Sequence, residues 1–183
     1  MKFKILLSRI YRFFFPIELV DVYKKMGVKI GENCKIQFDV VIDYSHYWLI
    51  EIGDNVTIAP RVHILAHDAS TFNYVGYTKI GKVNIEDNVF IGANSTILPG
   101  VKIGKNAIIG AGSVVTKDIP ENSIAVGNPA KIIGDISSFL AKTKIEMSEF
   151  PLFEEEYTLR SGVSDQMKQK MIDAINNKYG FVR

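Results

Sequence analysis

Aliphatic residues recur every six positions through the middle of the chain, and this period constrains the fold more than any other feature. From residue 85 to residue 115 the spacing holds without a slip, at Ile85, Ile91, Ile97, Ile103, Ile109 and Val115. An α-helix would repeat its apolar positions near 3.6 residues, and a half-buried strand would alternate them. A period of six fits a prism with three flat faces, in which each hexapeptide crosses one face. The sequence therefore predicts an all-β solenoid.

A second set of positions lies four residues after each aliphatic residue and is expected to face the same core. In the regular stretch these are Val89, Ser95, Val101, Ala107, Ser113 and Ile119. The phase extends backward to Ile30, Ile36, Ile42, Ile52, Ile58 and Ile64, if insertions are allowed. Their partners four residues later are Cys34, Val40, His46, Val56, Val62 and Asp68. These twelve aliphatic positions predict about four coils.

Two insertions interrupt the repeat. The first shifts the phase by four residues across 45–50 and is predicted to be a small bulge. The second, 69–82, cannot be read as faces of the prism and is predicted to be a loop that projects from it. Loops on a rigid scaffold often carry catalytic side chains, so we expect the functional site near this second insertion.

Glycine often follows the aliphatic residue, at Gly31, Gly53, Gly92, Gly104 and Gly110. A tight corner between two faces favours residues that tolerate unusual backbone angles, so an unusual φ is predicted at these glycines. Asparagine and aspartate next to them have the same local chemistry.

Composition is consistent with one core and excludes some classes of function. The chain has 183 residues, of which 47% are hydrophobic and 23% are charged, which suits a single solenoid domain with added helices. A net charge of +2 without any basic block gives no reason to expect nucleic acid. Cys34 is the only cysteine, so a disulfide within the chain and a thiolate metal cluster are excluded.

The first fifteen residues are basic and aromatic, with Lys2, Lys4, Arg9 and Arg12 among phenylalanines and aliphatic residues. The arginines interrupt the apolar run, which argues against a signal peptide, and the segment is too short to cross a bilayer. Two interpretations stay open. The segment is an amphipathic helix that caps the open end of the prism, or it lies on an anionic membrane surface.

After Pro120 the repeat is predicted to end. Residues 121–133 leave the solenoid, and 135–143 are predicted to form a short helix. Ser164 is a suitable N-cap for a last helix, whose apolar stripe is Met167, Met171, Ile172 and Ile175. The predicted parts are an N-terminal helical cap 1–27, a β-helix domain 28–133 with the inserted loop 69–82, and a C-terminal helical extension 134–183.

The three histidines differ in their expected environment. His67, in A-H-D-A-S, ends the last face of the second coil where the long insertion begins, so it is predicted to be functional. His63 and Asp68 are its neighbours along the chain. His46 falls in an inward slot beside the small bulge and is predicted to be structural or partly exposed.

Several of these stretches resemble the hexapeptide-repeat acyltransferases, within the branch of galactoside, maltose and polysaccharide O-acetyltransferases. They are I-A-P-R-V-H-I-L-A-H-D-A-S, G-A-G-S-V-V-T-K-D-I-P and V-G-N-P-A-K, and the resemblance covers about 28–133. It implies a left-handed parallel β-helix, an exception to the usual right-handed crossover. It also implies a bacterial homotrimer with active sites between subunits and with acetyl-CoA as the acyl donor.

Carried onto this sequence, the resemblance places the catalytic histidine at His67 and the acceptor-binding position at Asp39. Asp39 would bind a sugar hydroxyl or orient the imidazole from the neighbouring subunit, and His63 and Asp68 would line the acceptor side. The coenzyme A contacts fall on Ala93, Ala111, Thr116, Lys117 and Lys131.

The predicted function is O-acetylation of a sugar hydroxyl in a surface polysaccharide or its precursor. The sequence lacks the G-x-S-x-G elbow of serine acyltransferases, so direct transfer with a histidine general base is expected, without a metal. Phe72, Tyr74 and Tyr77 of the long insertion would stack on the sugar. The expected location is the cytoplasm, with possible peripheral contact at the inner face of the plasma membrane.

Four alternatives stay open. Two keep acetyl transfer: N-acetylation of a nucleotide-linked amino sugar, and acetylation of an antibiotic. A zinc hydratase resembling the γ-class carbonic anhydrases would use His46, His63 and His67. A non-catalytic trimeric scaffold is the last.

Overall fold

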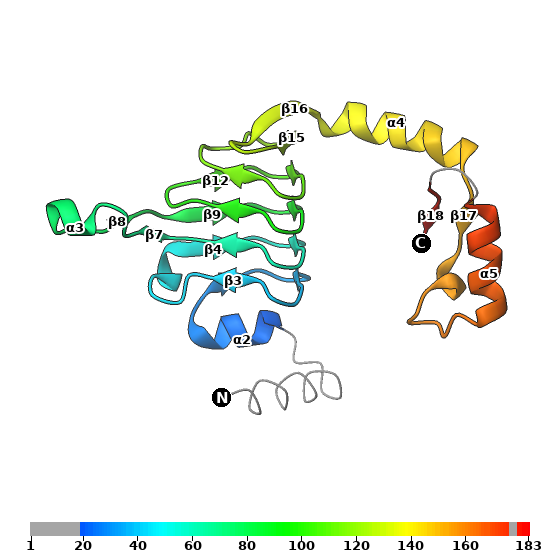
Figure 1. Ribbon diagram of the computed structural model, residues 1–183, viewed down its shortest axis with the longest axis horizontal. Helices are drawn as coiled ribbons and strands as arrows, with labels where there is room; N and C mark the ends of the chain where they lie inside the picture. Colours follow the sequence, from blue (N-terminus) through cyan, green and yellow to red (C-terminus); the bar gives the residue numbers. More distant parts are fainter. Residues whose placement is uncertain (1–18, 176–178) are drawn as a thin grey trace. The chain divides into compact units, whose positions relative to one another are not determined.

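The computed structural model describes residues 19–175 and 179–183, and its main part is a parallel β-helix (Figure 1). The first face of the prism consists of β1 (Lys29–Ile30), β4 (Ile50–Ile52), β9 (Val83–Ile85) and β12 (Lys102–Ile103). The second face begins with β2 (Lys35–Ile36), β5 (Thr57–Ile58), β10 (Phe90–Ile91) and β13 (Ile108–Ile109). The third consists of β3 (Val41–Ile42), β6 (His63–Ile64), β11 (Thr96–Ile97) and β14 (Val114–Val115). Three hexapeptides thus make one coil.

The parallel pairing stacks the repeated aliphatic residues in columns. On the first face Ile30 pairs with Ile52, Ile52 with Ile85, and Ile85 with Ile103. The other faces repeat this register, and most of these side chains are fully buried. The predicted solenoid is confirmed.

Two of the predicted core positions are wrong. His46 is only half-buried and Asp68 is exposed, although each follows an aliphatic residue by four positions. Insertions follow both, and the core places are filled by Ile50 and Val83, which are buried and are the first residues of β4 and β9. The repeat is therefore set by where the next strand begins, not by counting on from the previous one.

The glycines at the corners have a different reason from the predicted one. None of the five has a positive φ; that conformation belongs to asparagines such as Asn33, Asn55 and Asn88, with φ of 56 to 58°. The glycines instead lie where neighbouring coils approach closely. A Cβ added to Gly92 would lie 2.5 Å from the backbone N of Ala111 in the next coil.

The β-helix continues beyond the predicted four coils, with a bridge on the first face and a strand on the second. Ile119 forms a bridge with Ile103, and β15 (Ser123–Val126) pairs parallel with β13 on the second face. The prediction that 121–133 leave the repeat is therefore wrong for β15. The chain then reverses, and β16 (Lys131–Asp135) pairs antiparallel with β15. This pairing covers an edge of the sheet that would otherwise expose unpaired backbone groups.

The first coil is covered by α2 (Leu19–Met26). Leu19, Val20 and Tyr23 pack against the core, and the Tyr23 hydroxyl donates a hydrogen bond to the Val40 carbonyl at 2.7 Å. The basic segment 1–15 lies outside the described residues.

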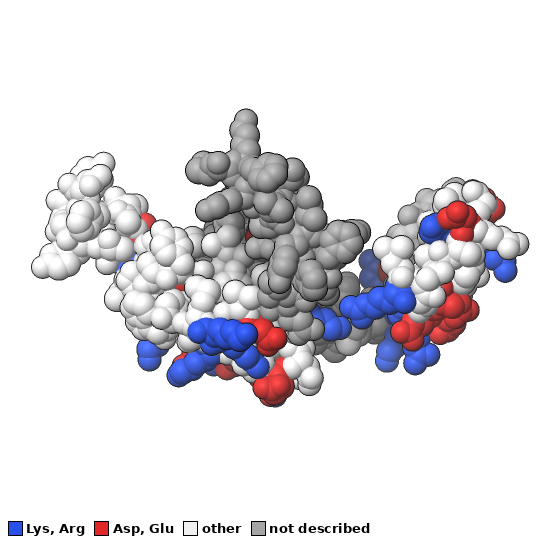
Figure 2. Space-filling model, turned by 90° about the horizontal axis from the view of Figure 1, so that it is seen from below, with Lys and Arg blue, Asp and Glu red and all other residues white. Residues whose placement is uncertain are grey.

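Both insertions have regular structure. The short one contains the 3₁₀ turn η1 (Tyr47–Leu49). The long one is an arm in which β7 (His67–Asp68) pairs antiparallel with β8 (Lys79–Ile80), and α3 (Phe72–Val75) lies near its tip. Figure 1 shows the arm projecting from the prism, and Figure 2 shows a tip without charged side chains.

The C-terminal residues form a separate compact unit that begins at Ser137. It contains most of α4 (Ile136–Glu149), followed by β17 (Leu152–Phe153), η2 (Glu155–Tyr157), α5 (Asp165–Ala174) and β18 (Phe181–Val182). The predicted helix 135–143 forms but continues to Glu149. The Ser164 side chain accepts a hydrogen bond from the Met167 backbone N–H, as an N-cap should. Within the described residues no helix is long and apolar enough to span a bilayer.

The close stacking of coils predicts the effect of a small substitution. Gly92→Ala should lower the free energy of unfolding by about 1 to 3 kcal/mol, because the new methyl group meets backbone that cannot move aside. Gly134→Ala is the matched control, since its Cβ would meet nothing within 4 Å. Urea denaturation at equal protein concentration measures both variants. Equal midpoints would show that the coils separate more easily than the packing implies.

Candidate active site

Two residues from neighbouring coils meet at one edge of the prism, where the chain leaves the third face for the first. Asp43 directly follows β3, and His67 lies just beyond β6 in the coil above. The backbone N–H of Asp43 donates to the Ile64 carbonyl at 2.9 Å, so Asp43 continues the ladder of the third face. Its side chain can therefore reach upward to the start of the arm.

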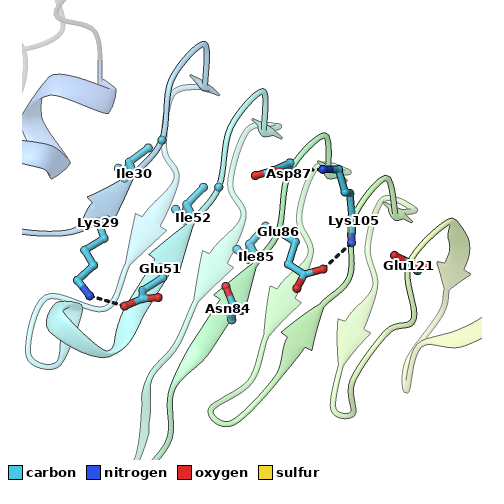
Figure 3. Close-up of a pocket in the computed structure, with 12 residues that line it drawn as sticks. Lys29, Ile30, Glu51, Ile52, Asn84, Ile85, Glu86, Asp87, Lys105 and Glu121 are labelled. Carbon is cyan, nitrogen blue, oxygen red and sulfur yellow. Dashed lines mark hydrogen bonds and ion pairs between the residues drawn. The ribbon is translucent and has the colours of Figure 1, made fainter.

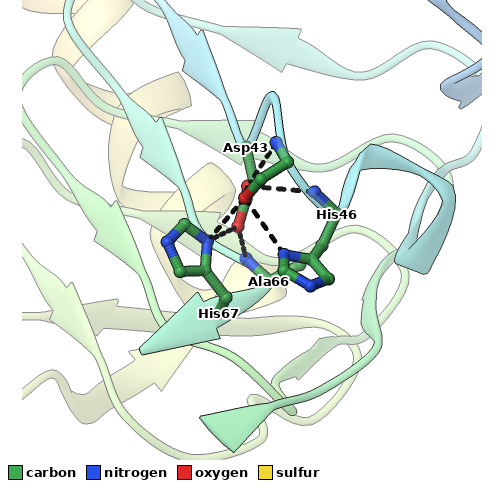
Figure 4. A network of polar contacts seen from close by, with 5 residues as sticks. Asp43, His46, Ala66 and His67 are labelled. Carbon is green, nitrogen blue, oxygen red and sulfur yellow. Dashed lines mark hydrogen bonds and ion pairs between the residues drawn. The ribbon is translucent and has the colours of Figure 1, made fainter. Parts of the chain in front are cut away.

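The Asp43 carboxylate lies in a dense set of hydrogen bonds (Figure 4). Oδ2 lies 2.5 Å from His67 Nδ1 and accepts the Ala66 backbone N–H at 2.9 Å. Oδ1 accepts the backbone N–H groups of Ser45 and His46 and the Ser45 hydroxyl at 2.9 Å. The side chain of Asp43 has no exposed surface, whereas that of His67 is 30% exposed.

These contacts determine the ionisation of Asp43. Burial raises the pKa of the carboxyl, but the hydrogen bonds from His67, Ala66 and Ser45 outweigh burial and hold the pKa of Asp43 below its ordinary value. An ionised Asp43 only accepts hydrogen bonds, so Nδ1 of His67 carries the proton that points to it. In the neutral imidazole, Nε2 is then the unprotonated nitrogen, available to accept a proton.

His46 is half-buried and lies beside this pair, a position that the prediction of a structural or partly exposed residue did not connect with His67. The Ser45 hydroxyl lies 3.0 Å from His46 Nδ1 and 3.2 Å from His67 Nδ1. The two imidazole rings are neighbours, with centroids 5.3 Å apart.

Asp43, His46 and His67 are close enough to be considered as metal ligands, with one ligand atom from each within 4.8 Å of the others. In a tetrahedral zinc site, however, oxygen and nitrogen ligands lie about 3.3 Å apart, because each is about 2.0 to 2.1 Å from the metal. The 2.5 Å between Asp43 Oδ2 and His67 Nδ1 is a hydrogen-bonding distance. His63, which the zinc alternative requires, is outside this group and exposed on the third face. The geometry therefore fits an acid–base pair better than that zinc site.

Asp39 lies at a different edge, between the second and third faces. It is exposed, and its φ of 57° places it at a corner in the same conformation as the corner asparagines. Within one chain the carboxylate that contacts His67 Nδ1 is that of Asp43. The alternative in which Asp39 orients the imidazole concerns the neighbouring subunit and stays a prediction. Asp68 is exposed beside His67, where Oδ1 accepts the Ser70 backbone N–H at 2.9 Å.

The residues predicted to contact coenzyme A fall at two edges. Ala93 and Ala111 follow β10 and β13, at the same edge as Asp39, and Ala93 O accepts the Gly112 N–H at 2.8 Å. Thr116 and Lys117 follow β14, at the edge that carries His67. Lys131 is exposed at the start of β16. The predicted site residues therefore do not all lie close together within one chain.

A groove of about 690 Å³ lies elsewhere, along the first face (Figure 3). Its lining includes Lys29, Glu51, Asp87 and Lys105 but not His67. The charges are already paired, Lys29 with Glu51 and Lys105 with Asp87. Without the histidine pair, this groove offers no comparable chemistry.

Sequence reasoning missed Asp43, although the repeat contains a signal for it. In the two coils above, the residue that follows the last aliphatic residue of the third face is Leu65 or Leu98, each partly buried. An acid at that position departs from the pattern. A buried carboxylate needs partners, and the histidine one coil above at the same edge is the candidate.

Comparisons with known proteins bear on the fold and on the family of the chain. The family described as the hexapeptide repeat of succinyl-transferase matches residues 82–117. A galactoside O-acetyltransferase of Lactococcus lactis is 36% identical over 165 residues, covering 74% of this chain and 78% of that protein.

Two solved structures are also similar. A maltose O-acetyltransferase from Clostridium difficile is 36% identical, with a TM-score of 0.53 over 63% of this chain and 73% of that one. A galactoside acetyltransferase in complex with coenzyme A is 34% identical, with a TM-score of 0.51 over 63% and 68%. The β-helix is thus of the left-handed kind, and the chain belongs to the hexapeptide-repeat acetyltransferases.

Proposed function

We propose that this enzyme transfers the acetyl group of acetyl-CoA to a sugar hydroxyl, in a surface polysaccharide or its precursor. The observation that carries the proposal is the pair formed by Asp43 and His67: the buried, ionised carboxylate fixes the histidine tautomer whose Nε2 can accept a proton. Relatives named galactoside and maltose O-acetyltransferase support the acceptor class, and the coenzyme A complex supports the donor.

The chemistry follows from that tautomer. His67 Nε2 removes the proton of the acceptor hydroxyl as the oxygen attacks the thioester carbonyl. Asp43 stabilises the imidazolium that forms, because its carboxylate remains ionised. The tetrahedral intermediate then collapses, the C–S bond breaks, and the imidazolium returns the proton to the thiolate of coenzyme A.

The distribution of site residues supports a homotrimer with active sites between subunits. His67 and Lys117 lie at one edge of the third face, whereas Asp39, Ala93 and Ala111 lie at the other. If the His67 edge of one chain meets the Asp39 edge of the next, the acid–base pair faces the small residues predicted to receive the pantetheine arm.

Changing either member of the pair should reduce turnover. His67→Ala and Asp43→Asn should each lower kcat by about 10²- to 10⁴-fold, the usual contribution of a positioned general base. The neutral amide in Asp43→Asn would leave His67 without the anion that selects its tautomer. Steady-state assays of acetyl transfer measure the effect, with Glu51→Gln, an exposed carboxylate on the first face, as control. A loss of only a few-fold in both variants would contradict the general-base assignment.

Lys117 and Lys131 should contribute to binding of the donor acetyl-CoA and not to the chemical step. Lys117→Ala and Lys131→Ala should each raise the KM for acetyl-CoA by roughly tenfold, because a charge-assisted contact contributes about 1.5 kcal/mol. Turnover should change little, since contacts far from the carbonyl bind ground and transition states alike. Lys170→Ala, an exposed lysine on α5, is the control. Unchanged KM values in both variants would make the two lysines ordinary surface charges.

An acceptor screen tests the proposed reaction. Purified enzyme with acetyl-CoA is offered methyl glycosides, oligosaccharides, nucleotide-linked amino sugars and streptogramin-like drugs, and release of coenzyme A is followed. We expect ester formation on a hydroxyl of a glycoside or oligosaccharide. Far faster acetylation of an amine, or of a drug, would preserve the enzyme class but overturn the proposed role.

A further inference from the structure

The short insertion places two aromatic rings beside the catalytic histidine. The His46 ring centroid lies 5.3 Å from that of His67, and the Trp48 ring centroid lies 5.3 Å from that of His46. Trp48 is 58% exposed although it is a large apolar side chain. The three rings form a row that leads away from the acid–base pair; we call His67, His46 and Trp48 the ring row.

Tyr47 and the backbone of the turn support the ring row. Tyr47 lies edge-on to Trp48, with ring centroids 5.3 Å apart and planes at 82°, and packs against the core. The turn is closed by the Leu49 backbone N–H, which donates to the His46 carbonyl at 3.0 Å, and Ile50 follows it into the core. A supported aromatic face of this kind loses little freedom when a ligand covers it.

The hydrogen bonds also determine which nitrogen of His46 is free. The Ser45 hydroxyl lies 2.9 Å from Asp43 Oδ1, and the anionic carboxylate is the stronger acceptor, so the hydroxyl donates to it. Its lone pairs then face His46 Nδ1 at 3.0 Å, which must carry a proton to make a hydrogen bond. His46 therefore has the same tautomer as His67, and both Nε2 atoms are acceptors.

We propose that the ring row is the acceptor subsite and that it selects a sugar ring with two neighbouring hydroxyls. His67 Nε2 takes the proton of the hydroxyl to be acetylated, while His46 Nε2 accepts a hydrogen bond from the adjacent hydroxyl. The apolar face of the sugar covers Trp48, which supplies a broad apolar surface next to polar groups. This inference rests on the proposed function and specifies its acceptor.

The arm offers the competing platform. Phe72, Tyr74 and Tyr77 are 53%, 88% and 78% exposed. The ring row differs because its rings contact one another in an unbroken series that reaches His67. If the arm were the sugar platform, its tyrosines and not Trp48 would control acceptor binding.

Trp48 is the only tryptophan of the chain, which gives a direct binding signal. Methyl β-D-galactopyranoside and other methyl hexopyranosides, titrated into the full-length protein with coenzyme A bound, should change tryptophan emission along a saturable curve. Coenzyme A alone should change it less. Saturable binding of an accepted glycoside, detected by calorimetry, with no change in emission would place the sugar away from Trp48.

Kinetics with two variants separate acceptor binding from support of His67. Asparagine at position 46 keeps an atom near the place of Nδ1 for the Ser45 contact but has nothing at Nε2, whereas glutamine reaches the place of Nε2. We expect His46→Asn to raise the acceptor KM about tenfold and His46→Gln to restore most of it, with the acetyl-CoA KM unchanged in both. Trp48→Ala should raise the acceptor KM by a similar factor, and Tyr74→Ala is its matched control.

Deoxy sugars provide the sharpest form of the test. For the best methyl glycoside, removing the hydroxyl next to the acetylated one should raise the wild-type KM about tenfold but should not raise that of His46→Asn further, because the partner is already absent. Retained discrimination in His46→Asn would contradict the contact. If kcat instead falls in His46→Gln but not in His46→Asn, the role of His46 is to hold Ser45 and Asp43 in place.

The outcomes distinguish a failure of this inference from a failure of the proposed function. If no glycoside or oligosaccharide is acetylated, the proposed function fails and the inference fails with it. If a glycoside is acetylated but Trp48→Ala and His46→Asn leave its KM unchanged while Tyr74→Ala raises it, the function stands and the ring row is not the subsite.

Discussion

The structure depends on how closely successive coils stack. Each strand contributes only two to five residues, so no face is stable alone, and the sheets form because every coil repeats the register of the one below. That repetition leaves no room for a side chain at the inner corners, where Gly92 approaches the backbone of Ala111. A scaffold fixed this tightly can hold groups from different coils at a constant separation, which acid–base chemistry requires.

The Asp43–His67 pair uses that property. Asp43 lies in one coil and His67 in the next. The backbone hydrogen bond from Asp43 N–H to the Ile64 carbonyl fixes the spacing of the two coils at this edge. Burying a carboxylate without partners would be costly, but the hydrogen bonds to Asp43 come from 45–46 below and from 66–67 above. The same bonds that make burial tolerable therefore also fix the imidazole tautomer.

Much of this was predictable from the sequence, and the failures have physical causes. The six-residue period sets the faces and the core because it depends on repetition alone. It predicted a functional role for His67 from its position at an insertion, and the structure places His67 beside Asp43. It put His46 in an inward slot, because counting from Ile42 ignores that the chain realigns at Ile50. The tolerance of glycine for unusual φ suggested strained corners, but the five predicted glycines have no positive φ and lie where neighbouring coils approach closely. Other corner residues, such as Asn33, Asn55 and Asn88, adopt the left-handed conformation. Asp43 stands out in the repeat as an acid where the two coils above have Leu65 and Leu98, but its pairing with His67 depends on which residues stack between coils.

The two insertions occur at the same edge of the prism, one coil apart, and this shared position explains why the site lies there. The first follows β3 and carries His46 and Trp48; the second follows β6 and begins with His67. In the next coil the same edge passes directly from β11 to β12 without an insertion. An insertion at an edge changes no strand register, because the chain rejoins the ladder at the next face, so functional side chains can be added there without disturbing the core. In a solenoid of this kind, phase slips that recur at one edge therefore mark the place where the repeat has been modified for chemistry.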